Sequence, residues 1–484
     1  MNYRKINKFL SEILILVAIA MLPSTFICLF DGETKVALSF LYSILIAVVL
    51  SVILKFISRK QSGGFHSREG LVCVSLSWIL ISLIGCLPFF FSRQIPSFID
   101  ALFEIVSGFT TTGASILPDV ESLSRGLLFW RSFSHWMGGM GVLVLLMVFV
   151  PKSDHNTGST MHLLRAESPG PNVGKLVPSM KKTALALYGI YMALTVLDFI
   201  FLIAGGMPPF DSVCTAFGTA GTGGFGIKND SMASYSPYIQ NVTTVFMLLF
   251  GINFSCYYLI LTKRFISVLK DEELRAYLGI FIGATALIAF NIYNMYSGIS
   301  ETLRHAAFQV STIMTTTGFA TTDFDKWPVF SKTLLLCLMF IGASAGSTAG
   351  GLKFQRLLLL IKNLKRHIRQ TLYPNKVQIV RMNGEKVNEK ILESTNLYLI
   401  GYTFIIVTSF LLISIDGFSI TSNMSAVISC FNNTGPGLEA VGPTCNFSGY
   451  SVFSKLVLIF DMLAGRLEIL PLLGLLSPRT WKRK

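Results

Sequence analysis

The sequence has few charged residues for its length. Only 14% of its 484 residues are charged, whereas 52% are hydrophobic. A typical soluble domain carries about 25% charged residues, so this composition excludes a soluble enzyme and a disordered chain. It predicts instead a membrane protein with many spans.

Motifs of enzymes and metal sites are also absent from the sequence. No CxxC occurs, and no Cys/His cluster has the spacing of metal ligands. Cys430 and Cys445 could meet on the outer side, although unpaired cysteines are the simpler interpretation. No Walker A motif, HExxH motif or serine elbow is present, and Gly221–Gly226 lacks the Lys that follows a phosphate-binding loop. We therefore expect no enzyme and no nucleotide bound by this chain.

Long apolar runs predict ten membrane spans. These runs lie at about 10–30, 36–57, 70–91, 126–150, 183–206, 238–262, 274–297, 329–360, 395–416 and 451–476. Four other apolar stretches are too short to span a membrane and are expected to be re-entrant or buried helices. These shorter stretches lie at 97–110, 209–220, 301–314 and 419–432.

The basic residues predict the topology of these spans. The net charge is +14, from 40 Lys and Arg against 26 Asp and Glu. A basic chain can bind nucleic acid, but 30 of these 40 residues lie in alternate links between the spans and at the two termini. Basic links stay on the cytoplasmic side. We therefore expect both termini in the cytoplasm, the four short helices on the outer side, and no nucleic-acid partner.

A polar turn rich in Thr and Gly follows each short helix. The four turns are Phe109–Ser115, Ala220–Phe225, Met314–Phe319 and Phe431–Gly437. Each turn lies between two long runs, so one unit is repeated four times after two extra N-terminal spans. The sequence thus predicts an all-α polytopic membrane protein with four span–pore-helix–span repeats around a pseudo-fourfold pore.

The composition of the turns fits an ion-selectivity filter. Such a filter replaces the water shell of an ion with backbone carbonyl oxygens. Glycine permits the backbone conformations that this requires, and threonine adds hydroxyl oxygens. Few acidic residues lie in the turns, so we expect a dehydrated monovalent cation rather than a divalent one.

The chain resembles the Trk/Ktr/HKT superfamily of potassium transporters, and most closely its bacterial TrkH/TrkG pore-subunit family. The resemblance rests on the four turns, on Gly342–Gly351 followed by Leu352 and Lys353, and on Ala464–Glu468. It covers essentially the whole chain. It implies potassium uptake across the bacterial inner membrane, a homodimer with one pore in each protomer, and a cytosolic nucleotide-binding ring of the TrkA type as a partner.

The family filter carries over to this chain position by position. One glycine per repeat predicts loose selectivity, so rubidium and sodium are expected to pass as well as potassium. Asn433 stands where other repeats have Thr, which predicts a chemically asymmetric ring. The implied potassium-binding filter consists of Thr110, Thr111, Thr112, Gly113, Thr222, Gly223, Gly224, Thr316, Thr317, Gly318, Asn433, Thr434 and Gly435.

The apolar run at 329–360 contains the one pronounced break in the sequence. Its glycines are Gly342, Gly346, Gly350 and Gly351. Each Gly costs a helix about 1 kcal/mol relative to Ala, so this segment can unwind and lie across the pore. A tightly packed helix seam is the alternative. The resemblance implies the intramembrane gating loop of the family.

Arg466 stands out because it lies in the middle of a span, where an unpaired charge is costly. An ion pair with Asp461 or Glu468 is the alternative, although neither has the spacing of a helical pair. The resemblance implies that Arg466 faces the pore below the filter and acts as a barrier to cations. Asp198 also lies in a span, and we assign it no role.

The cytoplasmic link after the break is strongly basic. Asn383–Gly384 lies between alternating residues, which predicts a β-hairpin. The basic residues could anchor the link at anionic membrane lipid or form a docking surface for the regulatory ring, and both interpretations stay open. Because the link follows the break, movement of a bound ring could pull on the gate.

The predicted organisation combines these features. Its parts are two N-terminal spans (1–69), repeat one (70–150), repeat two (183–262), repeat three with the interrupted gate helix (274–360), the link (361–390), repeat four (391–476) and a basic tail (477–484). Potassium symport coupled to protons or sodium is an open alternative. A secondary transporter for another solute is disfavoured, because that architecture needs paired breaks in two repeats.

Overall fold

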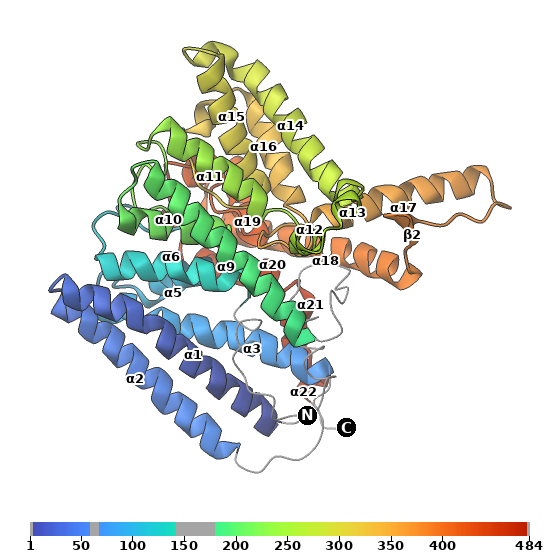
Figure 1. Cartoon of the computed structure of the whole chain (residues 1–484). Helices are drawn as coiled ribbons and strands as arrows, with labels where there is room; N and C mark the ends of the chain where they lie inside the picture. Colours follow the sequence, from blue (N-terminus) through green and yellow to red (C-terminus); the bar gives the residue numbers. More distant parts are fainter. Residues whose placement is uncertain (1–2, 59–66, 142–179, 482–484) are drawn as a thin grey trace.

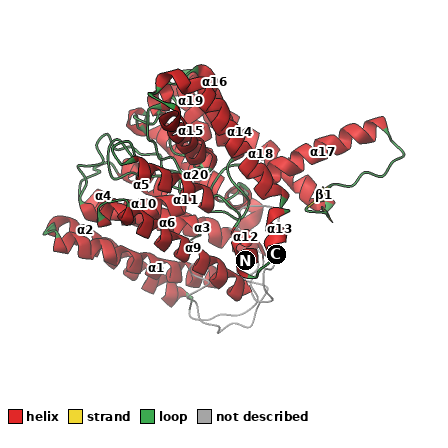
Figure 2. Cartoon of the chain, turned by 45° about the horizontal axis from the view of Figure 1, so that its top comes forward, coloured by secondary structure: helices red, strands yellow, loops and turns green. Residues whose placement is uncertain are grey.

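The computed structural model describes residues 3–58, 67–141 and 180–481. Over these residues the regular secondary structure consists of helices, joined by loops, and one short two-stranded hairpin (Figure 2). Figure 1 shows the first two helices at one edge of the helical body and α14, α15 and α16 at the opposite edge. In both views α17 projects from this body.

The first two helices form a pair at the edge of the bundle. α1 (Tyr3–Phe30) and α2 (Thr34–Ile57) are each long and apolar enough to cross a membrane. Gly32 has a φ of +76°, which lets the chain turn sharply between them. α1 also packs against α3 and α6, so the pair lies beside repeat one.

Four units of one design follow, each with a first helix, a short helix, a turn and a second helix. Repeat one has α3 (Ser67–Gly85), α4 (Leu87–Phe91), α5 (Phe98–Phe109) and α6 (Arg125–Gly139). Repeat two has α9 (Met180–Ala204), α10 (Pro209–Gly221), α11 (Pro237–Phe250), α12 (Phe254–Leu261) and α13 (Phe265–Leu269).

Repeats three and four keep this order. Repeat three has α14 (Glu272–Ile292), α15 (Ile299–Met314), α16 (Val329–Ile341) and α17 (Phe354–Leu372). Repeat four has α18 (Glu389–Ile413), α19 (Ile420–Asn432), α20 (Val452–Arg466), α21 (Leu470–Leu476) and α22 (Pro478–Trp481). Short 3₁₀ turns lie at Tyr293–Met295, Phe324–Lys326, Ser414–Asp416, Glu439–Val441 and Phe447–Gly449.

The short helices α5, α10, α15 and α19 lie where the sequence predicts them, and we call them the pore helices. Their starts carry ordinary helix signals. At α5 the Ser97 side chain accepts a hydrogen bond from the Asp100 N–H (3.3 Å), and at α19 Ser419 accepts from the Ser422 N–H (3.0 Å). α10 begins with Pro209, which suits the first helical position.

The prediction of ten spans, of which only that at 329–360 is interrupted, is only partly correct. Six described helices are long and apolar enough to cross a membrane, and these are α1, α2 and the first helix of each repeat. In repeat two the second span is bent by 88° between α11 and α12, and in repeat four it is divided at Arg466 between α20 and α21. The prediction of one pronounced break is therefore wrong, since the second spans of repeats two and four are also broken. Hydropathy does not reveal a break when the residues on both sides of it are apolar. Residues 142–150 of the predicted 126–150 span lie outside the described residues.

The predicted interruption of repeat three and the predicted hairpin are confirmed. A loop, residues 342–353, separates α16 from α17, and we call it the gate loop. Strands β1 (Arg381–Met382) and β2 (Glu385–Lys386) pair antiparallel around Asn383–Gly384. Cys430 is buried, Cys445 is exposed, and both are free thiols.

Candidate ion filter and gate

The same two backbone conformations recur in all four turns. The residue two positions before each filter glycine is left-handed, with φ of +57° at Thr111, +53° at Thr222, +55° at Thr316 and +56° at Asn433. Each glycine also has positive φ: +82° at Gly113, +70° at Gly224, +90° at Gly318 and +99° at Gly435. Non-glycine residues rarely adopt such φ values, so their recurrence shows that the four turns share one specialised geometry.

The four turns meet in a closed ring. A Cβ atom placed on any of the four glycines would collide with a carbonyl oxygen of another repeat. Such an atom would lie 2.1 Å from the Gly223 carbonyl oxygen for Gly113, 1.9 Å from that of Thr317 for Gly224, 2.4 Å from that of Thr434 for Gly318, and 2.7 Å from that of Thr112 for Gly435. Each glycine thus faces the carbonyl that precedes the next glycine, in the order one, two, three, four, one. Only glycine permits this approach.

Hydroxyl groups surround this ring and are buried with it. Thr110 and Thr112 share a hydrogen bond of 2.8 Å, and Thr315 and Thr317 share an equivalent one of 2.8 Å. The Asn433 amide donates to the Thr112 hydroxyl (3.0 Å) and so ties repeat four to repeat one. The chemically asymmetric ring that the sequence predicts is thus visible in these bonds.

Repeat two has Gly223 where repeats one, three and four have Thr, and His135 of α6 supplies the reason. A Cβ atom on Gly223 would lie 2.2 Å from the Nδ1 atom of His135. Nδ1 lies 2.8 Å from the Gly108 carbonyl, and the Phe225 N–H donates to Nε2 (3.3 Å). The imidazole therefore fills the space of the missing side chain and links the pore helix of repeat one to the turn of repeat two.

A buried ion pair supports the same junction. Arg131 of α6 and Glu104 of α5 are 2% and 0% exposed, and Arg131 Nη2 lies 2.7 Å from Glu104 Oε1. Glu104 also accepts from the Ile116 N–H (3.0 Å), while Arg131 donates to the Gly226 carbonyl (3.2 Å). The pair therefore fixes the chain just beyond Gly113 of repeat one and Gly224 of repeat two. Arg131 is thus a further charged residue within a predicted span, besides Arg466 and Asp198.

The second helices reach the ends of the pore helices through glycine. A Cβ atom on Gly138 would lie 1.9 Å from the Phe109 carbonyl, and one on Gly465 would lie 1.8 Å from the Phe431 carbonyl. These are equivalent contacts in repeats one and four. The negative ends of the pore-helix dipoles are directed at the ring, where they favour a cation.

The gate loop lies against the filter at the end next to the pore helices. The Gly350 N–H donates to the Thr316 hydroxyl (2.7 Å), and a Cβ atom on Gly350 would lie 2.2 Å from the Asn432 carbonyl. Gly342, Gly346 and Gly351 have φ of +71°, +69° and +78°, so the loop depends on glycine to fold back. The alternative of a continuous helix seam is wrong.

Arg466 connects the filter, the gate loop and α6. Its guanidinium donates to the Thr111 hydroxyl (3.3 Å), to the Thr348 carbonyl (2.9 Å), to the Gly139 carbonyl (2.8 Å) and to the Gly138 carbonyl. The two acidic residues near it in sequence have other partners. Glu468 pairs with Arg356 at the start of α17, and Asp461 accepts from Ser409 (2.7 Å).

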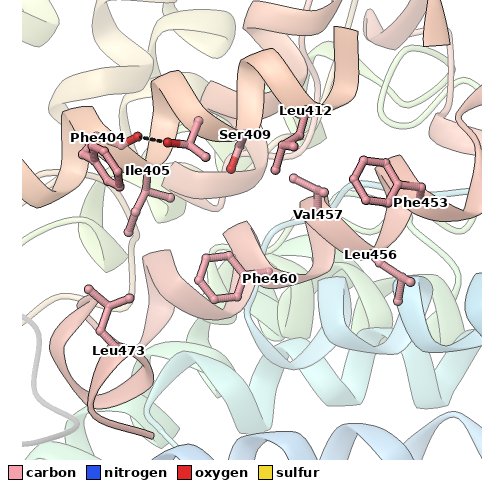
Figure 3. Close-up of a pocket in the computed structure, with 10 residues that line it drawn as sticks. Phe404, Ile405, Ser409, Leu412, Phe453, Leu456, Val457, Phe460 and Leu473 are labelled. Carbon is pink, nitrogen blue, oxygen red and sulfur yellow. Dashed lines mark hydrogen bonds between the residues drawn. The ribbon is translucent and has the colours of Figure 1, made fainter. Parts of the chain in front are cut away.

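An apolar groove lies between α18 and α20 (Figure 3), and no residue of the ring lines it. It measures about 410 Å³, and its lining includes Phe404, Val457, Phe460 and Leu473. Its few polar groups cannot surround a cation. Among the described residues no cluster of His, Cys, Asp and Glu could hold a metal ion either.

These features define the class of the protein as a polytopic, all-α membrane protein whose four repeats surround a pseudo-fourfold ring. The sequence profile of the TrkH family, described as a cation transport protein, matches residues 37–481. The chain belongs to the TrkH family, so the resemblance is confirmed. This is a family of transporters, which also confirms the expectation that the chain is not an enzyme.

Individual relatives match along the whole chain. The Trk system potassium uptake protein TrkH of Salmonella typhimurium is 35% identical over 490 residues and covers 100% of both chains. The Trk system potassium uptake protein TrkG of Escherichia coli is 31% identical over 473 residues, or 96% of both chains. The crystal structure of the potassium transporter TrkH from Vibrio parahaemolyticus aligns with a TM-score of 0.88, at 31% identity and with 100% coverage of both chains.

The structure brings all the predicted filter and gate residues together in one region. Sequence reasoning missed Glu104, Arg131 and His135, which support the filter from α5 and α6. Glu104 and Arg131 carried a signal, since each is a charged residue within an apolar stretch. His135 carried none, because its contacts join residues about 30 and 90 positions away.

We predict that Gly223→Thr lowers transport strongly, because the new side chain overlaps the imidazole of His135. Overpacking of this kind costs about 1–3 kcal/mol. Adding His135→Ala opens the space, so the double variant should regain part of the lost transport. Gly279→Thr is the control, because nothing lies within 4 Å of a Cβ atom there. Wild-type uptake by the Gly223→Thr single variant would contradict this assignment.

We also predict that Arg131→Ala destabilises the fold by about 3–5 kcal/mol, because it leaves the Glu104 carboxylate buried and unpaired. Thermal unfolding of the protein in detergent measures this loss. Lys326→Ala removes an exposed ion pair with Asp323 and should cost less than about 1 kcal/mol. Equal melting temperatures for the two variants would show that the buried pair is not a support of the filter.

Proposed function

We propose that the chain takes up potassium through a gated, channel-like pore in the bacterial inner membrane. The closed ring of glycine–carbonyl contacts is the observation that carries this proposal, because it brings one backbone carbonyl of each repeat into a single cycle. The potassium uptake named for TrkH of Salmonella typhimurium and TrkG of Escherichia coli supports the choice of ion.

The chemistry of the ring favours a monovalent cation. Its ligands are neutral oxygens from Thr112, Gly223, Thr317 and Thr434, and the pore helices direct their negative ends toward it. A divalent ion would require acidic ligands, and the four turns supply none. With a single aligned glycine in each repeat, and with hydroxyl groups that differ between the repeats, the filter should also admit rubidium and sodium.

The gate in this proposal is the gate loop together with Arg466. The loop contacts Thr316, and Arg466 contacts Thr111 on another repeat, so both act at the same end of the filter. A positive charge at this point opposes the passage of a cation, since electrostatic interactions are strong where water is excluded. Conduction then requires the loop and the guanidinium to move aside.

The proposed partners are a cytosolic regulatory ring, a second copy of the chain and membrane lipid. A TrkA-type ring that binds nucleotide would dock on the basic link, whose Lys365 and Arg369 are exposed. A second copy of the chain would form a homodimer with one pore in each protomer, and anionic lipid would contact the basic links. Both termini would lie in the cytoplasm, as the distribution of Lys and Arg predicts.

Potassium symport coupled to protons or sodium is the alternative function. The buried carboxyl groups of Asp198 on α9 and Asp461 on α20 are the observation that favours a proton-coupled route. Flux that follows an imposed pH gradient, and loses this dependence in Asp198→Asn or Asp461→Asn, would favour symport. A flux set by the potassium gradient alone would favour the gated pore.

We predict that the chain restores growth of an uptake-deficient bacterium at limiting potassium. Rescue follows from potassium conduction through the ring and should increase when the regulatory ring is supplied. Growth at several potassium concentrations, with the amount of membrane protein verified, is the measurement. Absence of rescue at normal protein levels would count decisively against the proposal.

We predict that Arg466→Ala raises potassium flux into liposomes about tenfold or more without a regulator, because it removes the positive charge below the filter. Lys365→Ala is the matched control, since it removes an exposed charge on α17. Unchanged flux for Arg466→Ala, at the wild-type level of incorporated protein, would eliminate the barrier role.

A further inference from the structure

Glu273, in the first turn of α14, holds the gate loop at Ala345, five residues before the Gly350 contact with the filter. It is 5% exposed, and its carboxylate accepts a hydrogen bond of 2.6 Å from the Ala345 N–H in the loop. The carboxylate also interacts with the backbone of Gln355 at the start of α17, and its charge attracts that of Lys353 at the end of the loop. One side chain therefore fixes the loop and the helix that follows it.

The two residues before Glu273 are bound to the tip of the cytoplasmic hairpin. Asn383 donates through its amide to Asp271 (2.8 Å), and its side-chain oxygen accepts from the Glu272 N–H (2.9 Å). The Asn383 N–H donates to the Glu272 carboxylate (3.0 Å). Lys362 of α17 bonds both this carboxylate and the Arg381 carbonyl. Hairpin, α17 and α14 thus meet in one polar cluster.

We propose that residues 271–273 form a latch that transmits the position of the hairpin to the gate loop, with Glu273 as the positioning residue. The inference rests on the proposed function, in which the gate loop blocks the pore. Asp271 caps α14 by accepting from the Leu274 N–H (2.8 Å), so the three residues belong to one ordered turn. A shift of the hairpin therefore shifts Glu273, which releases Ala345.

The strength of the latch comes from its chemistry. A hydrogen bond from a backbone N–H to a carboxylate is about twice as strong as one between neutral groups. Removing the acceptor also leaves a buried N–H without a partner, which the closed loop must then tolerate. The latch therefore stabilises the closed loop against the open one, and its loss should increase the open population.

The first test compares Glu273→Ala with Glu273→Gln in liposomes without a regulator. Glu273→Ala should raise potassium flux about tenfold, whereas Glu273→Gln should stay near the wild type because its amide oxygen still accepts from Ala345. Hydrogen exchange of the amides in residues 342–351 should accelerate in Glu273→Ala alone. Equal flux in the wild type and Glu273→Ala, with equal exchange, would overturn the latch.

The second test addresses the hairpin end of the latch. Asn383→Gly keeps the left-handed turn, since Asn383 has a φ of +49°, but removes both side-chain bonds. It should raise flux and loop exchange in the same direction as Glu273→Ala. Because both act on one path, the double variant should not exceed Glu273→Ala alone. Glu385→Gln, on the same hairpin, is the control and should behave as the wild type.

The outcomes separate this inference from the function on which it rests. A wild-type chain that conducts no potassium would contradict the proposed function. The latch could then still be tested by comparing hydrogen exchange of the gate loop in the wild type and in Glu273→Ala. Two results would overturn the latch while leaving the proposed function intact, provided that the wild type conducts potassium normally. One is that Asn383→Gly changes neither flux nor loop exchange. The other is that the flux increase of the double variant equals the product of the increases of Glu273→Ala and Asn383→Gly.

Discussion

The structure depends on one close contact that occurs four times. A glycine of each repeat faces a carbonyl oxygen of the next repeat at a distance that leaves no room for a Cβ atom. The ring closes only if all four turns lie at the same level, and buried polar contacts hold them there. The Arg131–Glu104 pair and His135 join repeats one and two, while the Asn433 amide joins repeats four and one. These contacts are costly to leave unsatisfied, so they specify the junctions strongly.

The tight ring also requires glycine in the second helix, or in the loop after it, of each repeat. Each second helix ends at the level of the filter, where a glycine of the same segment meets the end of a pore helix or the residue beside it. Gly138 and Gly465 meet carbonyls, and Gly251 would place a Cβ atom 2.8 Å from the Thr315 methyl group. In repeat three the break is long enough to form the gate loop, with Gly350 against Asn432. The gate loop is therefore a longer form of the break that also interrupts the second spans of repeats two and four.

Local sequence signals were enough to locate the pore helices and the turns that follow them. Apolar length and the Thr/Gly pattern located all four pore helices to within two residues, because caps, turns and helix lengths depend on near neighbours. The broken second spans were missed, because a single glycine such as Gly251 does not interrupt an apolar run. The supports of the filter depend on contacts between distant parts of the chain. Only the fold shows that His135 explains Gly223, or that Glu273 meets Ala345.

The central claim is that the ring of carbonyl oxygens from Thr112, Gly223, Thr317 and Thr434 binds the transported cation. Crystals grown with rubidium test it directly, because anomalous scattering locates the ion. The account predicts a rubidium peak on the axis of the ring, within coordinating distance of these oxygens, that weakens when potassium competes. A ring without anomalous density, in crystals that bind rubidium elsewhere in the protein, would contradict it.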